Sequence, residues 1–149
     1  MVAKTLAERI SADVLEIRPE KAYPDKGVRK FLWGGKSAVM AETPKLMPYT
    51  FKTQNYDRVI LGFPVWASNI APPIRTFVND NKNSLHDKQI AAFACQSGNG
   101  DEKAFAKLEG VLAGNKLIAT MILIDPKDKP SVENERKIKE FVEKVRSHV

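Results

Sequence analysis

Two short loops contain the residues whose types and spacing are suited to holding a ligand. The first loop, PVWASN at residues 64–69, follows a strand-forming run and contains Trp66, a large planar side chain flanked by prolines. The second loop, QSGNG at residues 96–100, is built of small and polar residues that let a ligand approach the backbone amides. An aromatic plane together with backbone N–H donors suits a flat aromatic ligand with polar edges.

The same residues also allow a purely structural interpretation. Trp66 would then cover the hydrophobic core, and QSGNG would be a turn, because aromatic residues and glycines are common where strands end. Composition and spacing alone leave both interpretations open.

The remaining reactive side chains indicate no chemistry of their own. Cys95 ends an apolar run and is interpreted as an inert core thiol, and a lone cysteine excludes an internal disulfide. His86 and His148 lie far apart in polar surroundings, and no metal-protease, phosphate-loop or paired-cysteine motif occurs. We therefore predict no catalytic side chain and no metal ligand, and we expect a cofactor to carry any chemistry.

The elements predicted around the two loops alternate between helix and strand. Four apolar stretches predict strands at Val14–Ile17, Arg58–Phe63, 89–95 and 116–124. The amphipathic or proline-initiated segments between and around them predict helices at 2–10, 28–40, 72–77, 101–112 and 132–149, the last with Ser131 as its N-cap. Alternation of this kind predicts a parallel sheet with helices on both faces, a three-layer α/β/α sandwich in one domain spanning residues 1–149. Both loops then fall at the carboxyl ends of strands, where such sheets bind ligands.

Charge and hydropathy limit the classes of partner. The net charge is +6, from 24 Lys and Arg against 18 Asp and Glu, but bases often lie beside acids, as in residues 133–140. This mixing is typical of a solvated helix surface, so nucleic acid is an unlikely partner. No apolar run approaches the roughly 18 residues of a membrane span, and the N-terminus lacks a signal-peptide pattern, so we expect a cytoplasmic protein with no membrane partner.

Residues 59–78, VILGFPVWASNIAPPIRTFV, resemble the flavodoxin family, in particular its short bacterial branch. AAFACQSGNG at 91–100 is similar to the second flavin loop, and LEIRPEKAYP at 15–24 resembles the segment after the second strand of that branch. The resemblance implies a flavodoxin-like sandwich that binds FMN non-covalently, with Trp66 as the stacking residue. By position, one side of the flavin ring would be lined by Pro64, Val65, Trp66, Ala67 and Asn69, and its pyrimidine edge would meet the backbone amides of Gln96, Ser97, Gly98, Asn99 and Gly100.

The sequence departs from the family at its beginning. The family's first strand and its Ser/Thr- and Gly-rich phosphate loop do not precede the predicted helix 2–10. We therefore expect a four-stranded sheet, weakened FMN binding and homo-oligomerisation through unpaired strand edges. The basic net charge also differs from the acidic partner surface of electron-transfer flavodoxins.

Three functional hypotheses follow. The first is an FMN-dependent redox protein that serves a redox partner protein or a small electron acceptor, as an electron carrier or a small reductase. The second is a flavin-free module that keeps the fold and self-associates. The third is binding of polyanions driven by net charge.

Overall fold

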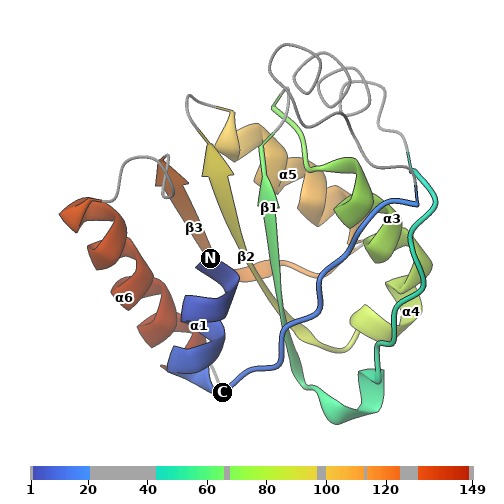
Figure 1. Ribbon diagram of the computed structural model, residues 1–149, viewed down its shortest axis with the longest axis horizontal. Coiled ribbons are helices and arrows are strands. Elements are labelled where there is room, and N and C mark those ends of the chain that lie inside the picture. The colour runs from blue at the N-terminus through green and yellow to red at the C-terminus, as the bar shows by residue number, and fades with distance from the viewer. Residues whose placement is uncertain are drawn as a thin grey trace.

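Three parallel strands form the centre of the fold (Figure 1). The computed structural model describes residues 2–20, 43–65, 68–96, 100–112, 114–124 and 131–147. In the order β1-β2-β3, the strands are β1 Arg58–Pro64, β2 Gln89–Gln96 and β3 Leu117–Ile124. Both pairings are parallel, with Gly62 opposite Phe93 in the first. The predicted parallel sheet and α/β class are confirmed.

Helices cover both faces of this sheet (Figure 1). On one face lie α1 Val2–Ile10 and α6 Val132–Ser147, whose buried residues form one apolar cluster with β2 and β3. On the other face lie α3 Pro72–Asp80, α4 Lys82–Leu85 and α5 Asp101–Val111. The three-layer arrangement therefore matches the prediction.

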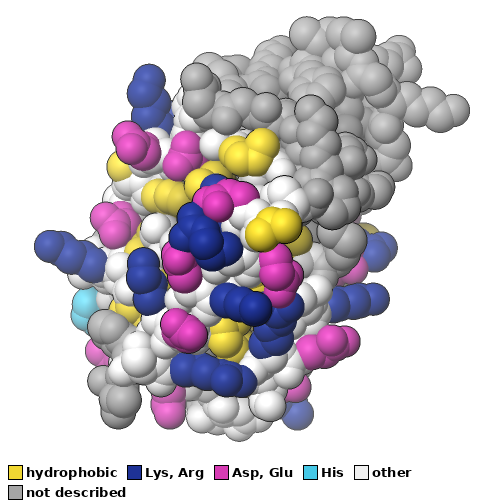
Figure 2. Space-filling model, turned by 90° about the vertical axis from the view of Figure 1, so that its left-hand side faces the viewer, with side chains coloured by type: hydrophobic (Ala, Val, Ile, Leu, Met, Phe, Trp, Pro, Cys, Tyr) yellow, Lys and Arg dark blue, Asp and Glu magenta, His cyan; other side chains and the backbone are white. Residues whose placement is uncertain are grey.

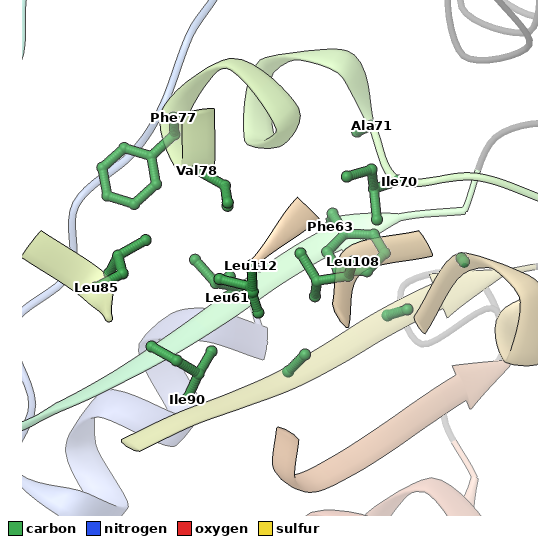
Figure 3. Close-up of a cluster of buried hydrophobic side chains, with 13 residues drawn as sticks. Leu61, Phe63, Ile70, Ala71, Phe77, Val78, Leu85, Ile90, Leu108 and Leu112 are labelled. Atoms are coloured by element: carbon green, nitrogen blue, oxygen red, sulfur yellow. The ribbon is translucent and has the colours of Figure 1, made fainter. Parts of the chain in front are cut away.

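The larger core lies between the sheet and α3, α4 and α5 (Figure 3). Leu61 and Phe63 point into it from β1, whereas Ile60 and Gly62 belong to the opposite face, as the two-residue period of a strand requires. Ile90 enters the same core from β2 and is completely buried. Burial on both faces explains why the strands appear in the sequence as continuous apolar runs.

The predicted strand at Val14–Ile17 does not form, so the sheet has three strands in the described part of the chain rather than four. Residues 12–18 have no regular structure, and only a single antiparallel bridge, Pro19 to Leu46, follows them. Val14 and Leu15 are 52% and 42% exposed, and no described strand lies beside this apolar stretch to bury it. The predicted helix 28–40 lies outside the described residues.

The outer edge of β1 has backbone groups that no described residue pairs with. Gln89 N donates to Asp57 O, and Val65 N donates to Cys95 O, so odd-numbered residues of this segment face β2. The N–H groups of Ile60 and Gly62 therefore point away from β2, and no described partner accepts from them. Proline ends this strand at position 64, on the outward side, where an N–H is not needed.

The side chain of Asn134 joins the end of β3 to the first turn of α6. Its Oδ1 accepts from Ile124 N at 3.3 Å, and its Nδ2 donates to Ile124 O at 3.0 Å. Asn134 N in turn donates to the Oγ of Ser131 at 3.0 Å, which confirms the predicted N-cap. The buried amide thus pairs with a strand backbone as a neighbouring strand would.

Replacing Asn134 with alanine should lower the free energy of unfolding by about 1–3 kcal/mol, because both Ile124 backbone groups lose their partner. Urea unfolding measures this loss. Asn115→Ala is the matched control, since Asn115 donates a single side-chain bond, to Leu85 O. An equal loss in both variants would contradict the bridging role of Asn134.

Acidic and basic side chains are interspersed on the face shown in Figure 2. On α6, Arg136 forms ion pairs with both Glu133 and Glu140, and Arg9 of α1 pairs with Glu135 at 2.5 Å. This arrangement supports the interpretation of residues 133–140 as a solvated helix surface. Within the described ranges, no helix combines the length and apolar character that crossing a bilayer requires.

Candidate functional site

The loops after β1 and β2 meet at the carboxyl ends of these strands. Ser68 and Gly100 both have a positive φ, 58° and 106° respectively. A Cβ atom built on Gly100 would lie 2.7 Å from Ser68 Oγ and 3.0 Å from Ser68 Cα. Only a glycine at position 100 permits this approach, so the absence of a side chain sets the spacing between the loops.

A hollow of about 310 Å³ lies beside this contact. It is lined by Ser68, by Gly100 and by the first turn of α5, Asp101 to Lys103. A helix N-terminus normally attracts anions, but Asp101 and Glu102 place two carboxylates there. This end of α5 therefore suits the polar edge of an uncharged ring better than a phosphate group.

Gln96, the last residue of β2, contacts the same helix turn. Its Nε2 donates to Asp101 Oδ1 at 3.2 Å. Its Oε1 is shielded from solvent and has no hydrogen-bond partner in the described structure. Leaving a buried acceptor unpaired costs about 1–3 kcal/mol, so this orphaned oxygen indicates a place for a ligand donor.

The predicted site residues of the first loop have different roles. Pro64 is exposed at the end of β1, whereas Val65 is half-buried against the larger core and donates its N–H to Cys95 O at 3.0 Å. Asn69 is 3% exposed, and its Oδ1 accepts from Ile70 N at 2.9 Å and from an Arg75 guanidinium nitrogen at 2.7 Å. The Asn69 side chain therefore braces the loop from within.

In the second loop, the structure describes Gln96 and Gly100, and it brings both against the first turn of α5. Five predicted site residues, Trp66, Ala67, Ser97, Gly98 and Asn99, lie outside the described residues. Cys95 is half-buried, and its burial raises the pKa of the thiol, which keeps it protonated at neutral pH. This agrees with its interpretation as an inert thiol.

Sequence reasoning did not assign Ser68 or the first turn of α5 to the site. Ser68 is within the first loop, and Asp101 directly follows the second, so their adjacency to the predicted site residues was the available signal. The hydrogen bond between Gln96 and Asp101 is not visible in a sequence, so only the structure places this helix turn at the site.

A second hollow, of about 460 Å³, lies between residues 43–49 and α3. Thr76 Oγ1 donates to Pro44 O at 2.7 Å and holds this segment to the helix. No group of three His, Cys, Asp or Glu side chains suited to a metal ion occurs among the residues that the structure describes. The hollow at Ser68 and Gly100 is therefore the better candidate site, since it adjoins two predicted ligand loops.

The chain matches the family model for flavodoxin over residues 1–145. Its fold is similar to that of a flavoprotein from Lactobacillus acidophilus NCFM solved in complex with FMN, with a TM-score of 0.66 and 17% identity over 93% of this chain and 89% of that one. Two proteins assigned as flavoproteins, from Bacteroides eggerthii DSM 20697 and Bacteroides uniformis ATCC 8492, have TM-scores of 0.73 and 0.72.

The two Bacteroides proteins are 18% and 21% identical to this chain, cover 95% of it, and are themselves covered over 86% and 88% of their length. No curated protein matches the sequence at a significant level. At such identities the solved structures establish the fold, and the family match extends over nearly the whole chain. The chain therefore belongs to the flavodoxin family.

Proposed function

We propose that this protein binds FMN non-covalently where the loops after β1 and β2 meet, and that it uses the flavin in redox chemistry. The observation that carries this proposal is the close approach of Ser68 and Gly100 above a hollow at the carboxyl ends of the strands. The similar fold of a protein solved with FMN supports it. The bound flavin would supply one- or two-electron transfer, to a redox partner protein or a small acceptor.

The residues present fit such a ring. The unpaired Gln96 Oε1 requires a donor, and the edge of the flavin ring contains one. The Ser68–Gly100 contact would hold the two loops at a fixed separation, and Asn69 would brace the first of them. Trp66 would stack on the ring and exclude water from one of its faces.

The carboxylates of Asp101 and Glu102 disfavour a phosphate at α5, so we propose that the ring supplies most of the affinity. FMN and riboflavin should then bind with similar affinity. Quenching of flavin fluorescence at several salt concentrations measures both affinities. Tight, stoichiometric FMN with a large preference over riboflavin would contradict the weak phosphate contribution.

Replacing Trp66 with alanine should weaken FMN binding by about 1–3 kcal/mol, the usual contribution of aromatic stacking to a planar base. Trp66→Phe keeps an aromatic plane and should lose less. The same fluorescence titration measures both variants. Equal affinities in Trp66→Ala and the parent chain would show that Trp66 is an ordinary packing residue. If neither FMN nor riboflavin gave saturable quenching with the parent chain, the proposed function would be overturned.

The outer edge of β1, which no described residue pairs with, favours a second candidate, a flavin-free module that self-associates. The observation behind it is that the N–H groups of Ile60 and Gly62 have no acceptor among the described residues, since exposed strand edges pair readily with another chain. This candidate predicts a mass that rises with protein concentration in light scattering, together with no flavin binding. A monomer at all concentrations would exclude it.

A further inference from the structure

Residues 43–49 include an extended stretch whose backbone is paired on one side. Lys45 O and Met47 N form hydrogen bonds of 2.7 and 2.9 Å with the backbone of residues 18–20. In an extended chain, the N–H and C=O of one residue share a side, and those of the next residue point to the opposite side. The backbone groups of Leu46 therefore point away from residues 18–20.

The other side of this stretch faces α3 (Figure 1). Pro44 O, two residues before Leu46 and so on the same side, accepts from Thr76 Oγ1 at 2.7 Å. The N–H and C=O of Leu46 have no partner among the described residues. They lie on the side of the hollow of about 460 Å³ that residues 43–49 form with α3. This volume is within the range of about 300–1,000 Å³ that is typical of ligand sites.

Prolines limit how much of a partner this edge is able to pair with. Positions 44, 46 and 48 share the side that faces the hollow, and Pro44 and Pro48 have no N–H to donate. Leu46 thus supplies the one backbone donor among these three positions. Prolines at a strand edge prevent the addition of a long strand. The edge therefore suits a single residue of an extended chain, which would exchange both of its backbone hydrogen bonds with Leu46.

Tyr49, which also lines the hollow, is oriented as a hydrogen-bond donor. Its hydroxyl accepts from Asn81 Nδ2 at 2.8 Å, and the same nitrogen donates to Phe77 O at 2.8 Å. Because a carbonyl oxygen only accepts, the Asn81 atom must be the amide nitrogen, and both of its hydrogens are used. The Tyr49 hydroxyl is left with its own proton to donate to a bound group.

The wall formed by α3 adds a negative charge. Asp80 lines the hollow, is exposed, and forms no ion pair with a described residue. Among the described residues that line the hollow, Lys45 is the one base, and it belongs to the opposite wall. A carboxylate beside a position for backbone pairing favours a Lys or Arg side chain in the bound segment.

We propose that this hollow binds an extended peptide segment of a partner protein. One residue of the segment pairs with the backbone of Leu46, and a basic side chain of the segment pairs with Asp80. A peptide is the matching chemistry, because the N–H and C=O of one residue complement the acceptor and donor that Leu46 offers. A second copy of this chain is the poorer occupant, since a net charge of +6 makes two copies repel each other. The site lies outside the flavin loops and does not depend on them.

The test is an NMR titration of the isotope-labelled full chain with the blocked peptide acetyl-Val-Lys-Val-methylamide. The Leu46 amide signal should shift saturably, with a dissociation constant in the millimolar range, because one residue supplies only two backbone hydrogen bonds. Methylation of the lysine backbone nitrogen removes the donor to Leu46 O. It should weaken binding about fivefold or more.

Two variants separate recognition of the side chain from recognition of the backbone. The parent chain should prefer lysine over norleucine in the peptide by about threefold, and Asp80→Asn should remove this preference. Asp87→Asn, which changes an exposed carboxylate outside the hollow, is the matched control and should keep it. Leu46→Pro removes the N–H on the side of the hollow but leaves the bonds of Lys45 and Met47 in place. It should abolish saturable binding while amide signals elsewhere keep their positions.

Each contrary outcome overturns a stated part of the proposal. No saturable shift of the Leu46 amide with the parent chain would overturn the site itself. Binding that backbone methylation of the peptide leaves unchanged would overturn the pairing with Leu46, and a lysine preference retained in Asp80→Asn would overturn the role of the carboxylate. A shift of the same signal when the protein alone is concentrated would identify a second copy as the occupant instead.

Discussion

Replacing Gly100 with alanine should lower both the stability of the protein and its affinity for flavin, whereas Gly114→Ala should lower stability alone. The two glycines have nearly the same backbone, with φ of 106° and 111°. At either position, an alanine in this left-handed conformation lowers the free energy of unfolding by about 1–2 kcal/mol. The difference in stability between the two variants therefore measures the effect of the atoms around each glycine.

The surroundings of the two glycines are unlike. A Cβ at Gly114 would have no atom within 4 Å, whereas one at Gly100 would meet Ser68 Oγ at 2.7 Å and Ser68 Cα at 3.0 Å. Ser68 backbone has to move to accommodate the methyl group, so we expect a further loss of about 1–3 kcal/mol in stability. Because this movement separates the two ligand loops, flavin affinity should fall in Gly100→Ala and stay at the parent value in Gly114→Ala.

Urea unfolding without ligand and flavin titration measure the two effects. Ser68→Gly removes the Oγ and Cβ atoms, so combining it with Gly100→Ala should restore part of the lost affinity. If Gly100→Ala and Gly114→Ala lost equal stability and kept equal affinity, the contact between the loops would have no role in the site.

Replacing Gly62 with alanine should destabilise the protein, whereas Gly110→Ala should stabilise it. A Cβ at Gly62 would lie 2.1, 2.5 and 2.8 Å from three atoms of the Phe93 ring. Phe93 is the residue opposite Gly62 in the sheet and is 8% exposed. The ring occupies the space that the missing side chain leaves. An alanine at position 62 would therefore force the ring out of the core that α1 and α6 cover.

Overpacking of this kind costs about 1–3 kcal/mol. Gly110 is in α5 with no atom within 4 Å of a built Cβ, so alanine there should gain about 0.5–1 kcal/mol from its higher helix propensity. Urea unfolding of the two variants measures these opposite changes in the free energy of unfolding. In a Phe93→Leu background the shorter side chain should relieve the clash, and Gly62→Ala should cost much less. Stabilisation by Gly62→Ala in the parent chain would contradict the packing of Phe93 over β1.

Much of the fold was predictable because burial on both faces leaves a strong signal. The apolar run at Val59 to Leu61 predicted a parallel strand, and β1 begins at the predicted Arg58. The proline pair predicted the start of α3 at Pro72, since proline in the first turn loses no hydrogen bond. These signals are local, so they do not depend on which segments are neighbours in space.

The predicted strand at Val14–Ile17 was wrong because a strand depends on its neighbours in space as well as on local signals. Its apolar residues have the composition of a strand, but a strand forms only where a neighbour supplies the other half of the ladder. Asn69 also shows what packing adds. It is predicted to line the flavin, and in the structure its amide oxygen accepts from Ile70 N and from Arg75, which only packing brings to it.

The sequence by itself determined the alternation of helix and strand and the two loops at the strand ends, because these depend on residue type and local period. Only the tertiary structure decided that Ser68 touches Gly100, that Phe93 fills the space above Gly62 and that Gln96 Oε1 lacks a donor. Each of these relations joins residues that are close in space through the register of the sheet or the meeting of two loops. Register and loop contacts are set by the packing of the whole domain, and no local pattern encodes them.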